Sequence, residues 1–241
     1  MAIYYLSLKH GSRGKNQRAG AHLRYITRLA RYKYNSDQVK FISFGNFPSW
    51  VKTPVDFWDM ADKFSMKNAR LYSEFEAALP RELTLTEQVE LALEFVYLEL
   101  KTHHPFTLVI HDSPAIDGLS HPHFHLMFST KKHDGIEREK AVFFAKANPV
   151  NPKKGGVPKD RTWIHKSRLE AARKLWERLV NEALARAEVA ARVDCRSLKA
   201  QGIDRKPQPR LTQFETVLYR QGIVTPKIQM ILDLRELAKS R

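Results

Sequence analysis

The segment His-Pro-His-Phe-His-Leu-Met-Phe at residues 121–128 tells most about the fold. Its histidines alternate with other residues, and an apolar alternation continues through Leu126 and Phe128. Successive side chains of a strand point to opposite faces of a sheet. The pattern therefore predicts a strand over residues 123–130, with histidines on one face and a hydrophobic core on the other.

Two histidines of this segment are spaced to hold one metal ion. Side chains at i and i+2 of a strand lie roughly 6.5 Å apart, and imidazole nitrogens bind a metal at about 2 Å. Three in line cannot all reach one ion, so a third ligand is expected from a neighbouring strand. His111 ends an apolar run one loop away, and Pro122 suits a strand start better than its interior. We therefore expect His111, His123 and His125 as ligands and His121 as a bystander, against the alternative of ordinary surface histidines.

Strands and helices are interleaved around this segment. Apolar or alternating runs predict strands at Ile3–Leu8, Leu71–Leu79 and Phe106–His111. Residues 71–79 place Ser73, Phe75 and Ala77 on one side and Tyr72, Glu74 and Glu76 on the other. Helical spacing and start signals predict helices at Ala19–Tyr32, Pro54–Ala61, Thr84–His103 and His165–Val189. The pattern predicts an α/β fold around one sheet.

The loops are rich in turn residues. Asp112–Ser120 connects two predicted strands, and Asn148–Arg161 holds prolines and glycines among lysines, which indicates a long basic loop. Prolines at 207 and 209 mark a break, after which a helical appendage or a linker is expected.

Charge indicates an anionic partner. The 241 residues carry a formal net charge of +15, and the chain has no Asp or Glu before Asp37. Eight cations fall in that first segment, at Lys9, Arg13, Lys15, Arg18, Arg24, Arg28, Arg31 and Lys33. Such segregation favours nucleic acid binding over a merely solvated basic surface, although charge does not distinguish DNA from RNA.

The composition of the chain indicates in which cellular compartment it functions. Cys195 is the only cysteine, which excludes internal disulfides and suits a reducing environment. No run approaches the roughly 18 apolar residues of a membrane span, and no secretory signal begins the chain. We expect a cytoplasmic protein without membrane insertion.

Two tyrosines lie on the predicted basic helix. At about 100° per residue, Tyr25 falls at the border of the apolar face, between Ile26 and Arg28. Tyr32 lies two turns further on, almost beneath it. Spacing alone does not choose between them, and an aromatic residue at such a border is often only packing.

From Met1 to about Leu211, the chain resembles the relaxase domain of the MobA/MobL family, the nicking enzymes of mobilizable plasmids. The likeness rests on Met-Ala-Ile-Tyr at 1–4, Gly-Ser-Arg at 11–13, Tyr25-Ile followed by Tyr32, Glu74-x-Glu76-x-Ala-Leu-Pro-x-Glu-Leu-Thr-Leu85, Thr107-Leu-x-Ile-His111, Pro122-His-x-His-Leu-Met127, Asp134-Gly-Ile-Glu-Arg138 and Leu198-x-Ala-Gln-Gly-Ile203. The resemblance implies a mostly antiparallel central sheet flanked by helices, with a relaxase domain at 1–211 and an appendage at 212–241.

The resemblance also implies roles for individual residues. The tyrosine matching Tyr25 is the nucleophile, the histidines matching His111, His123 and His125 bind Mn²⁺ or Mg²⁺, and acidic residues at Glu74 and Glu76 lie at the active site. A solvent-facing acidic pair is the alternative for these two. His121 departs from the family, in which a non-ligand such as Asn stands at this position.

The implied function is site-specific nicking and rejoining of single-stranded DNA at a plasmid transfer origin, through a 5′-phosphotyrosine intermediate. Accessory mobilization proteins and a type IV secretion coupling protein are expected partners. Alternatives are a rolling-circle replication initiator, whose histidine motif typically precedes its tyrosine, a metal nuclease that uses water, and a non-catalytic basic DNA-binding module.

Phosphate contacts are expected from two basic segments that could flank a groove, unless the loop is merely solvated. They are Lys9, Arg13, Arg24 and Arg28 near the N-terminus, and Lys153, Lys154 and Lys159 in the loop.

Overall fold

The computed structural model describes residues 3–115, 118–204, 207–209 and 211–239. Parts of the expected first segment, hairpin loop and proline break lie outside the described residues, namely Met1 and Ala2, Ile116 and Asp117, and Arg205 and Lys206. The helices and strands, in chain order, are β1 (Leu6–Ser12), η1 (Arg13–Lys15), α1 (Ala19–Ile26), η2 (Ala30–Gln38), β2 (Val39–Gly45), α2 (Pro54–Phe64), β3 (Arg70–Ala78), α3 (Leu85–Leu100), β4 (Phe106–Pro114), β5 (Ser120–Phe128), α4 (Lys140–Phe144), η3 (Pro152–Lys154), η4 (Thr162–Ile164), α5 (Lys166–Arg186), α6 (Gln213–Arg220) and α7 (Pro226–Lys239).

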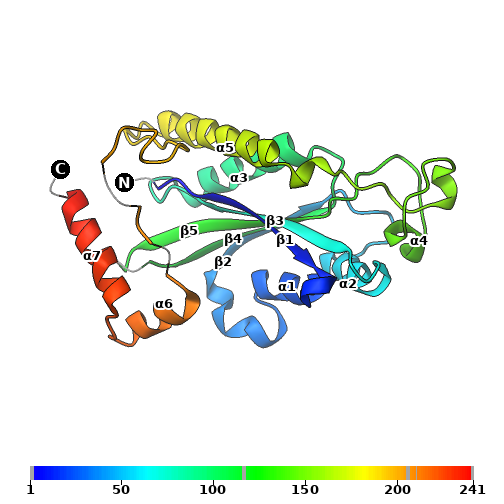
Figure 1. The fold of residues 1–241 in the computed structure, drawn as a ribbon, viewed down its shortest axis with the longest axis horizontal. Coiled ribbons are helices and arrows are strands. Elements are labelled where there is room, and N and C mark those ends of the chain that lie inside the picture. The colour runs from blue at the N-terminus through cyan, green and yellow to red at the C-terminus, as the bar shows by residue number, and fades with distance from the viewer. Residues whose placement is uncertain (1–2, 116–117, 205–206, 210, 240–241) are drawn as a thin grey trace. The chain divides into compact units, whose positions relative to one another are not determined.

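One antiparallel sheet organises the described chain, in the order β1-β3-β5-β4-β2. Helices α3 and α5 cover one face of this sheet, and α1 and α2 cover the other (Figure 1). β5 is the middle strand, with β3 and β4 on either side of it. Side chains of these strands that point to the α1 face therefore lie on the same side of the sheet as that helix. This architecture confirms the predicted α/β fold.

The two faces of the central strands carry different chemistry, as their alternation predicted. On the side of α3 and α5, Phe75, Phe124 and Phe128 are fully buried in one core. On the other side β3 presents Tyr72 and Glu74, and Tyr72 joins a second core with residues of α1 and α2. The apolar side of the sheet therefore holds the strands rigid while the opposite side is free to carry polar groups.

Start signals in the sequence act as expected. Thr84 and Glu87 form the predicted capping box that begins α3, because each side chain satisfies a backbone amide at the start of the helix. A similar pair, Thr53 and Asp56, begins α2. The apolar stripe of α5 is buried through Trp176, as its helical spacing predicts.

The first strand differs from the prediction of Ile3–Leu8. β1 begins at Leu6 and runs to Ser12, and Ile3 is 53% exposed. Polar residues extend the strand because they have cross-strand partners: His10 Nδ1 lies 2.8 Å from Ser73 Oγ, and Lys9 is bonded to Glu76. Apolar content alone missed this extension.

The predicted helix Ala19–Tyr32 is too long. α1 ends at Ile26, and Arg28 and Ala30 adopt positive φ angles of 55° and 54°. The carbonyl of Ile26 accepts a hydrogen bond from His111 Nε2 at 2.6 Å, so it is bound to a distant strand. Helical periodicity in the sequence does not predict this contact.

Two further details correct the prediction. The edge strand β2 was not predicted, and its Ile42 and Phe44 are 43% and 51% exposed. Pro122 lies inside β5 rather than at its start. This position is tolerated because Pro122 contributes its carbonyl, which accepts from the amide of Leu79 at 2.9 Å, and no amide is needed there.

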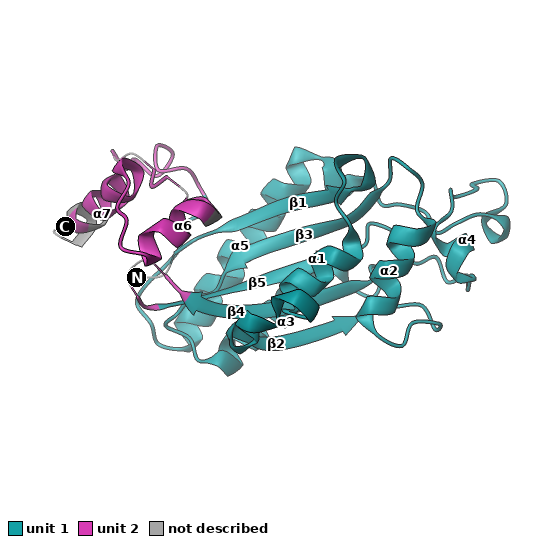
Figure 2. Ribbon diagram, turned by 90° about the horizontal axis from the view of Figure 1, so that it is seen from below, with its two compact units in different colours: residues 1–113, 120–195 teal, residues 114–119, 196–241 magenta. Residues whose placement is uncertain are grey.

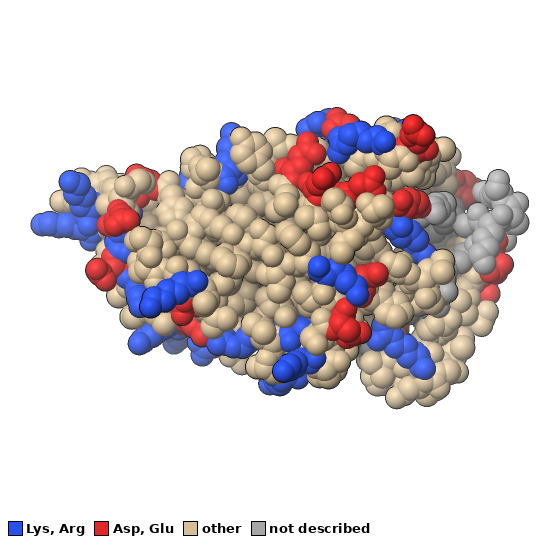
Figure 3. Space-filling model, turned by 180° about the vertical axis from the view of Figure 1, so that it is seen from behind, with Lys and Arg blue, Asp and Glu red and all other residues tan. Residues whose placement is uncertain are grey.

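Charge is unevenly distributed over the surface. The face turned away from the viewer of Figure 1 has few charged side chains over its middle (Figure 3). A path for a phosphate backbone needs cations, so it is expected on another face.

The chain divides into two compact units (Figure 2). The first comprises residues 1–113 and 120–195 and contains the five-stranded sheet, apart from the last residue of β4. The second comprises residues 114–119 and 196–241 and contains α6 and α7. The expected domain boundary at residue 211 stays a prediction.

Candidate active site

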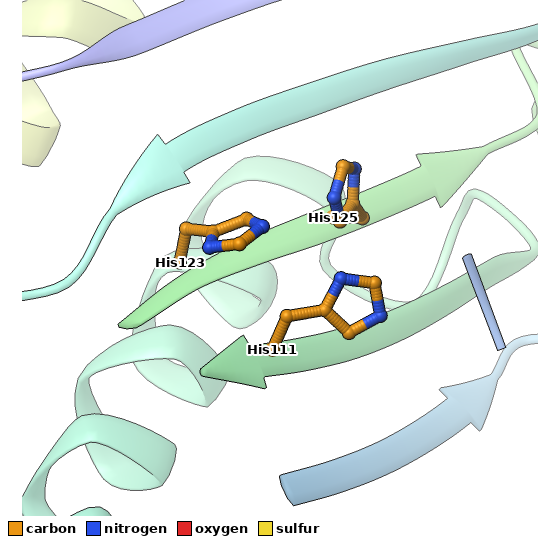
Figure 4. Close-up of side chains that lie close together, drawn as sticks. All are labelled: His111, His123 and His125. Atoms are coloured by element: carbon orange, nitrogen blue, oxygen red, sulfur yellow. The ribbon is translucent and has the colours of Figure 1, made fainter. Parts of the chain in front are cut away.

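The three predicted histidine ligands lie together on the α1 face of the sheet (Figure 4). His111 comes from the end of β4, and His123 and His125 come from β5. One nitrogen from each ring lies within 4.8 Å of the other two. The ring centroids are 5.0 Å apart for His111 and His125, and 5.4 Å apart for His111 and His123. A buried cluster of this kind could hold a metal ion.

Each of the three rings is anchored through one nitrogen. His111 Nε2 lies 2.6 Å from the carbonyl oxygen of Ile26, and His123 Nδ1 lies 2.9 Å from that of His121. His125 Nδ1 lies 2.8 Å from Glu74 Oε1. Metal-binding histidines are oriented in this way, because the anchored N–H fixes the tautomer and leaves the other nitrogen free to bind.

The fit to a metal rests on an orphaned atom. The His111 side chain is fully buried, and its Nδ1 has no hydrogen-bond partner among the described residues. A buried polar nitrogen without a partner is costly unless a ligand satisfies it. Burial, followed by the charges of His125 and His123, lowers the pKa of His111 to about 3. The ring is therefore neutral at physiological pH, as metal binding requires.

Glu74 connects the histidine cluster to α1. Its side chain is 3% exposed, and Oε1 lies 2.8 Å from His125 Nδ1 and 3.0 Å from His22 Nε2. Burial opposes ionisation of Glu74, but the two imidazoles outweigh it and hold the carboxyl pKa well below its usual range. Glu74 is therefore a buried carboxylate that orients a candidate metal ligand.

His22 was missed by sequence reasoning. Its ring stacks on Tyr72 at 4.6 Å between centroids and lies 6.2 Å from the Tyr25 ring. Nε2 is buried near Glu74 without a well-directed hydrogen bond. The available signal was its position three residues before Tyr25, because such residues share a face of a helix.

Glu76 has a different environment from Glu74. It is bonded to Lys9 of the neighbouring strand β1, and the Glu76 side chain is 14% exposed. Burial alone would lower the pKa of Lys9, but the bond to Glu76 and the charge of Glu76 outweigh it. The pKa of Lys9 is therefore raised. The two acids that alternate on β3 therefore differ in what they bind.

Tyr25 lies next to the residue that anchors His111. It occupies the last turn of α1, one position before Ile26. The guanidinium of Arg28 lies 4.8 Å from the Tyr25 ring centroid, and the Tyr32 ring meets it edge-on at 5.4 Å. The hydrogen bond between His111 and Ile26 thus ties the helix that carries Tyr25 to the histidine cluster.

The predicted DNA-binding cations near the N-terminus have internal partners. Arg24 makes two hydrogen bonds to Asp59, at 2.7 and 2.8 Å, and Arg13 donates to the carbonyls of Asp62 and Ser65. Arg28 donates to the carbonyl of Tyr25 at 3.2 Å. These bonds fix the three basic side chains in place.

The lysines of the basic loop are less tied by internal hydrogen bonds than the arginines near the N-terminus. Lys153 and Lys154 are exposed in η3, whereas Lys159 Nζ donates to the Arg70 carbonyl at 3.2 Å. Val157 of the same loop is buried in the core that includes α1 and α2. Val157 therefore attaches the loop to the core on the α1 and α2 side of the sheet.

A second group of potential ligands is a weaker candidate. Glu177, Asp194 and Cys195 also have ligand atoms within 4.8 Å of one another. Burial and the neighbouring Glu177 raise the pKa of Cys195 to about 11. A protonated thiol is a poor metal ligand, so the histidine cluster is the better site.

The fold and the site define a class: a relaxase with a histidine cluster on the central strands of an antiparallel sheet. The chain belongs to the MobA/MobL family of plasmid mobilization relaxases, whose sequence profile matches residues 2–216.

Individual relatives agree with this assignment. The chain is 41% identical over 235 residues to Mobilization protein A of Escherichia coli, covering 97% of this chain and 33% of that protein. It is 39% identical over 215 residues to the 43 kDa relaxation protein of Salmonella typhimurium, covering 86% of this chain and 57% of that protein. The chain thus spans about a third to somewhat over half the length of these two relatives.

A solved structure shares the fold. It is described as the molecular basis of vancomycin resistance transfer in Staphylococcus aureus, and it superimposes with a TM-score of 0.58 at 22% identity. The match covers 81% of this chain and 100% of that one. Among the described residues, no helix is long and apolar enough to cross a membrane.

Proposed function

We propose that this chain nicks one strand of DNA at a plasmid transfer origin and later rejoins it, with Tyr25 as the nucleophile. The observation that carries the proposal is the 2.6 Å hydrogen bond from His111 Nε2 to the carbonyl of Ile26. It links the histidine cluster to the residue after Tyr25, so a phosphate held at the cluster lies beside the helix of the tyrosine. Among the described residues, neither residue adjacent to Tyr32 in sequence is hydrogen-bonded to the histidine cluster.

The chemistry conserves the energy of the bond that is cut. The Tyr25 hydroxyl oxygen attacks the phosphorus and loses its proton, while the bond from phosphorus to the 3′ oxygen breaks. The 3′ oxygen leaves and takes up a proton, and the 5′ phosphate stays on the tyrosine. A free 3′-hydroxyl can then attack the phosphotyrosine and restore the strand. Water as the nucleophile would discard that bond energy.

The chain's own groups prepare this reaction. His111, His123 and His125 would hold a divalent ion, which polarises a phosphate oxygen when bound. Glu74 orients His125, and Arg28 places positive charge over the Tyr25 ring, where a phosphate must approach. Imidazole nitrogens suit transition metals and Mg²⁺ prefers oxygen, so Mn²⁺ is the ion of choice for testing.

The proposed substrate is single-stranded DNA, and the proposed setting is the cytoplasm. Accessory mobilization proteins and a type IV secretion coupling protein are the partners that such a function implies. The net charge of +15 supports an extended phosphate-binding surface.

The test is trapping of the covalent intermediate. The chain is incubated with Mn²⁺ and a single-stranded random-sequence library, labelled at either the 3′ or the 5′ end, and run on a denaturing gel. The 3′ label should migrate with the protein and the 5′ label should not. Sequencing of the trapped DNA would give the nick site.

Variants assign the nucleophile. Tyr25→Phe should abolish the adduct with DNA binding nearly intact, and Tyr32→Phe should keep most of it. An adduct that forms at the normal rate with Tyr25→Phe would refute the assignment. Cleavage without an adduct would indicate a water-using nuclease, and binding without cleavage would indicate a non-catalytic module.

A further inference from the structure

A cavity of about 410 Å³ lies between α1, η2 and α2, outside the histidine cluster. Its volume is within the range of small-molecule sites in proteins, roughly 300–1,000 Å³. The lining residues include charged and aromatic ones, namely Arg18, Arg24, Arg31, Tyr32, Asp59 and Asp62. The small side chains of Ala21 and Ala30 complete the lining and leave its interior open.

The wall favours an anionic ligand because its two carboxylates already have partners. Asp59 accepts two hydrogen bonds from Arg24, and Asp62 accepts from the backbone amides of Ala19 and Gly20, at 2.8 and 2.9 Å. By contrast, Arg18 and Arg31 make no ion pair within the described part of the chain. Two arginines without an ion pair therefore line a space whose two carboxylates are already hydrogen-bonded.

The wall also offers a surface for stacking. The Tyr32 ring is half-buried in the lining, and the Arg31 guanidinium lies 5.0 Å from its centroid. Aromatic rings and guanidinium planes are the groups on which unpaired nucleobases stack. One pair of adjacent residues thus offers a cation for a phosphate and an aromatic ring for a planar base.

One lining residue of the cavity contacts the proposed nucleophile. The Tyr32 ring contacts the Tyr25 ring edge-on, with centroids 5.4 Å apart. The backbone at Arg28 and Ala30, where α1 gives way to η2, has positive φ angles. Such angles are unfavourable for residues other than glycine, and strain of this kind is commonly found at functional sites.

We propose that this cavity binds one unpaired nucleotide of the DNA strand next to the phosphodiester that Tyr25 attacks. The base stacks on Tyr32, and Arg18 and Arg31 bind its phosphate. The proposal rests on the proposed function, because it takes single-stranded DNA as the substrate, and it adds a nucleotide subsite that the histidine cluster does not provide.

The test uses the unmodified chain first. A fluorescein-labelled oligodeoxythymidylate, with 5-iodouracil in place of thymine, is bound to the protein and irradiated, and the crosslinked peptide is identified by mass spectrometry. Because 5-iodouracil couples to aromatic rings on which it stacks, the crosslink should fall on Tyr32. A crosslink found only on other aromatic residues would overturn the proposal.

Variants then measure the contribution of each group. Tyr32→Leu should weaken binding of the unmodified oligodeoxythymidylate about tenfold, whereas Tyr32→Phe should stay within about twofold because its ring still stacks. Arg31→Ala should lower the slope of log affinity against log salt by about 0.7. The matched control is Tyr34→Leu, since Tyr34 lies two residues along the same segment and is 77% exposed. Its binding should equal that of the wild type.

The outcomes separate this proposal from the proposed function. Wild-type binding that is unchanged in Tyr32→Leu and Arg31→Ala would overturn the nucleotide cavity and leave the nicking reaction intact. A wild-type chain that does not bind single-stranded DNA would overturn both. Equal losses in the Tyr32 and Tyr34 variants would show a general effect of η2 and would also refute the cavity.

Discussion

Glu74 Oε1 lies 2.8 Å from His125 Nδ1, which joins β3 to the histidine cluster on β4 and β5. Because the pKa of Glu74 is held well below its usual range, the oxygen is an anionic acceptor and His125 Nδ1 carries the proton. Nε2 of His125 is then the nitrogen available to a metal. The carboxylate makes this ligand more basic without binding the ion itself.

Substitution of Glu74 should therefore weaken metal binding more than it lowers the stability of the fold. Glu74→Gln keeps an acceptor oxygen but removes its charge, so the affinity for Mn²⁺ should fall about 10- to 100-fold. Calorimetric titration measures this loss. The matched control is Glu76→Gln, two residues along the same strand and bonded to Lys9, which should change Mn²⁺ affinity much less. Equal losses in both variants would contradict the distinct role of Glu74.

Local periodicity was enough to predict the polar and apolar faces of the central strands. The alternation on β3 and β5 separates Phe75 and Phe124 from Glu74 and His125, and the structure confirms it. The same pattern predicted that His111 would join the other two histidines, because one loop connects its strand to theirs. Hydrophobic burial on one face forces the polar set onto the other, which makes this part of the site predictable.

Contacts between distant residues were not predictable from periodicity. α1 ends at Ile26 because its carbonyl accepts from His111, a residue 85 positions away in sequence. His22 reaches Glu74 only because α1 packs on β3. Single polar residues carry no periodic signal, so these contacts had to come from the structure.

The ligand set can be tested with four single substitutions. Titration of Mn²⁺ into His111→Ala, His123→Ala and His125→Ala should show loss of binding, since each ring offers one free nitrogen. His121→Ala should bind normally, because the main-chain carbonyl of His121 anchors His123 and survives the substitution. Loss of binding in the His121 variant, with His111 dispensable, would refute the set.

Stability should fall as the metal-free protein is acidified. The pKa of His111 is lowered to about 3 in the folded chain, from 6.5 in the unfolded chain, first by burial. The unfolded chain therefore binds this proton first as pH falls below about 6.5, and the folded state loses about 1.4 kcal/mol per pH unit until pH nears the folded value. Above pH 6.5 the contribution is complete and constant.

Urea unfolding with a chelator present, between pH 7.5 and pH 5, measures this dependence. His111→Gln removes the titrating group, so its unfolding free energy should depend less steeply on pH by about the same 1.4 kcal/mol per unit. Identical slopes for the variant and the wild type would show that His111 takes up its proton equally in both states.

The basic loop gives a prediction about how DNA is held. Val157 is buried in the core that includes α1 and α2, while Lys153 and Lys154 of the same loop are exposed. Each lysine that contacts a phosphate of a single strand contributes about 0.7 to the slope of log affinity against log salt. Replacing Lys153, Lys154 and Lys159 together by Ala should flatten that slope by up to about 2. Most of the change should come from the exposed pair, because Lys159 already donates to the Arg70 carbonyl.

A matched control separates a DNA path from general charge loss. Lys166 and Lys174 are exposed on α5, which covers the opposite face of the sheet. Lys166→Ala/Lys174→Ala therefore removes the same charge as Lys153→Ala/Lys154→Ala from an element on the other side of the sheet. Salt titrations with oligodeoxythymidylate should give a flatter slope only for the loop variant, and the loss of affinity should be alike for other sequences because phosphate contacts carry no base specificity. An unchanged slope in the loop variants would mean that the loop is merely solvated and that the DNA follows another path.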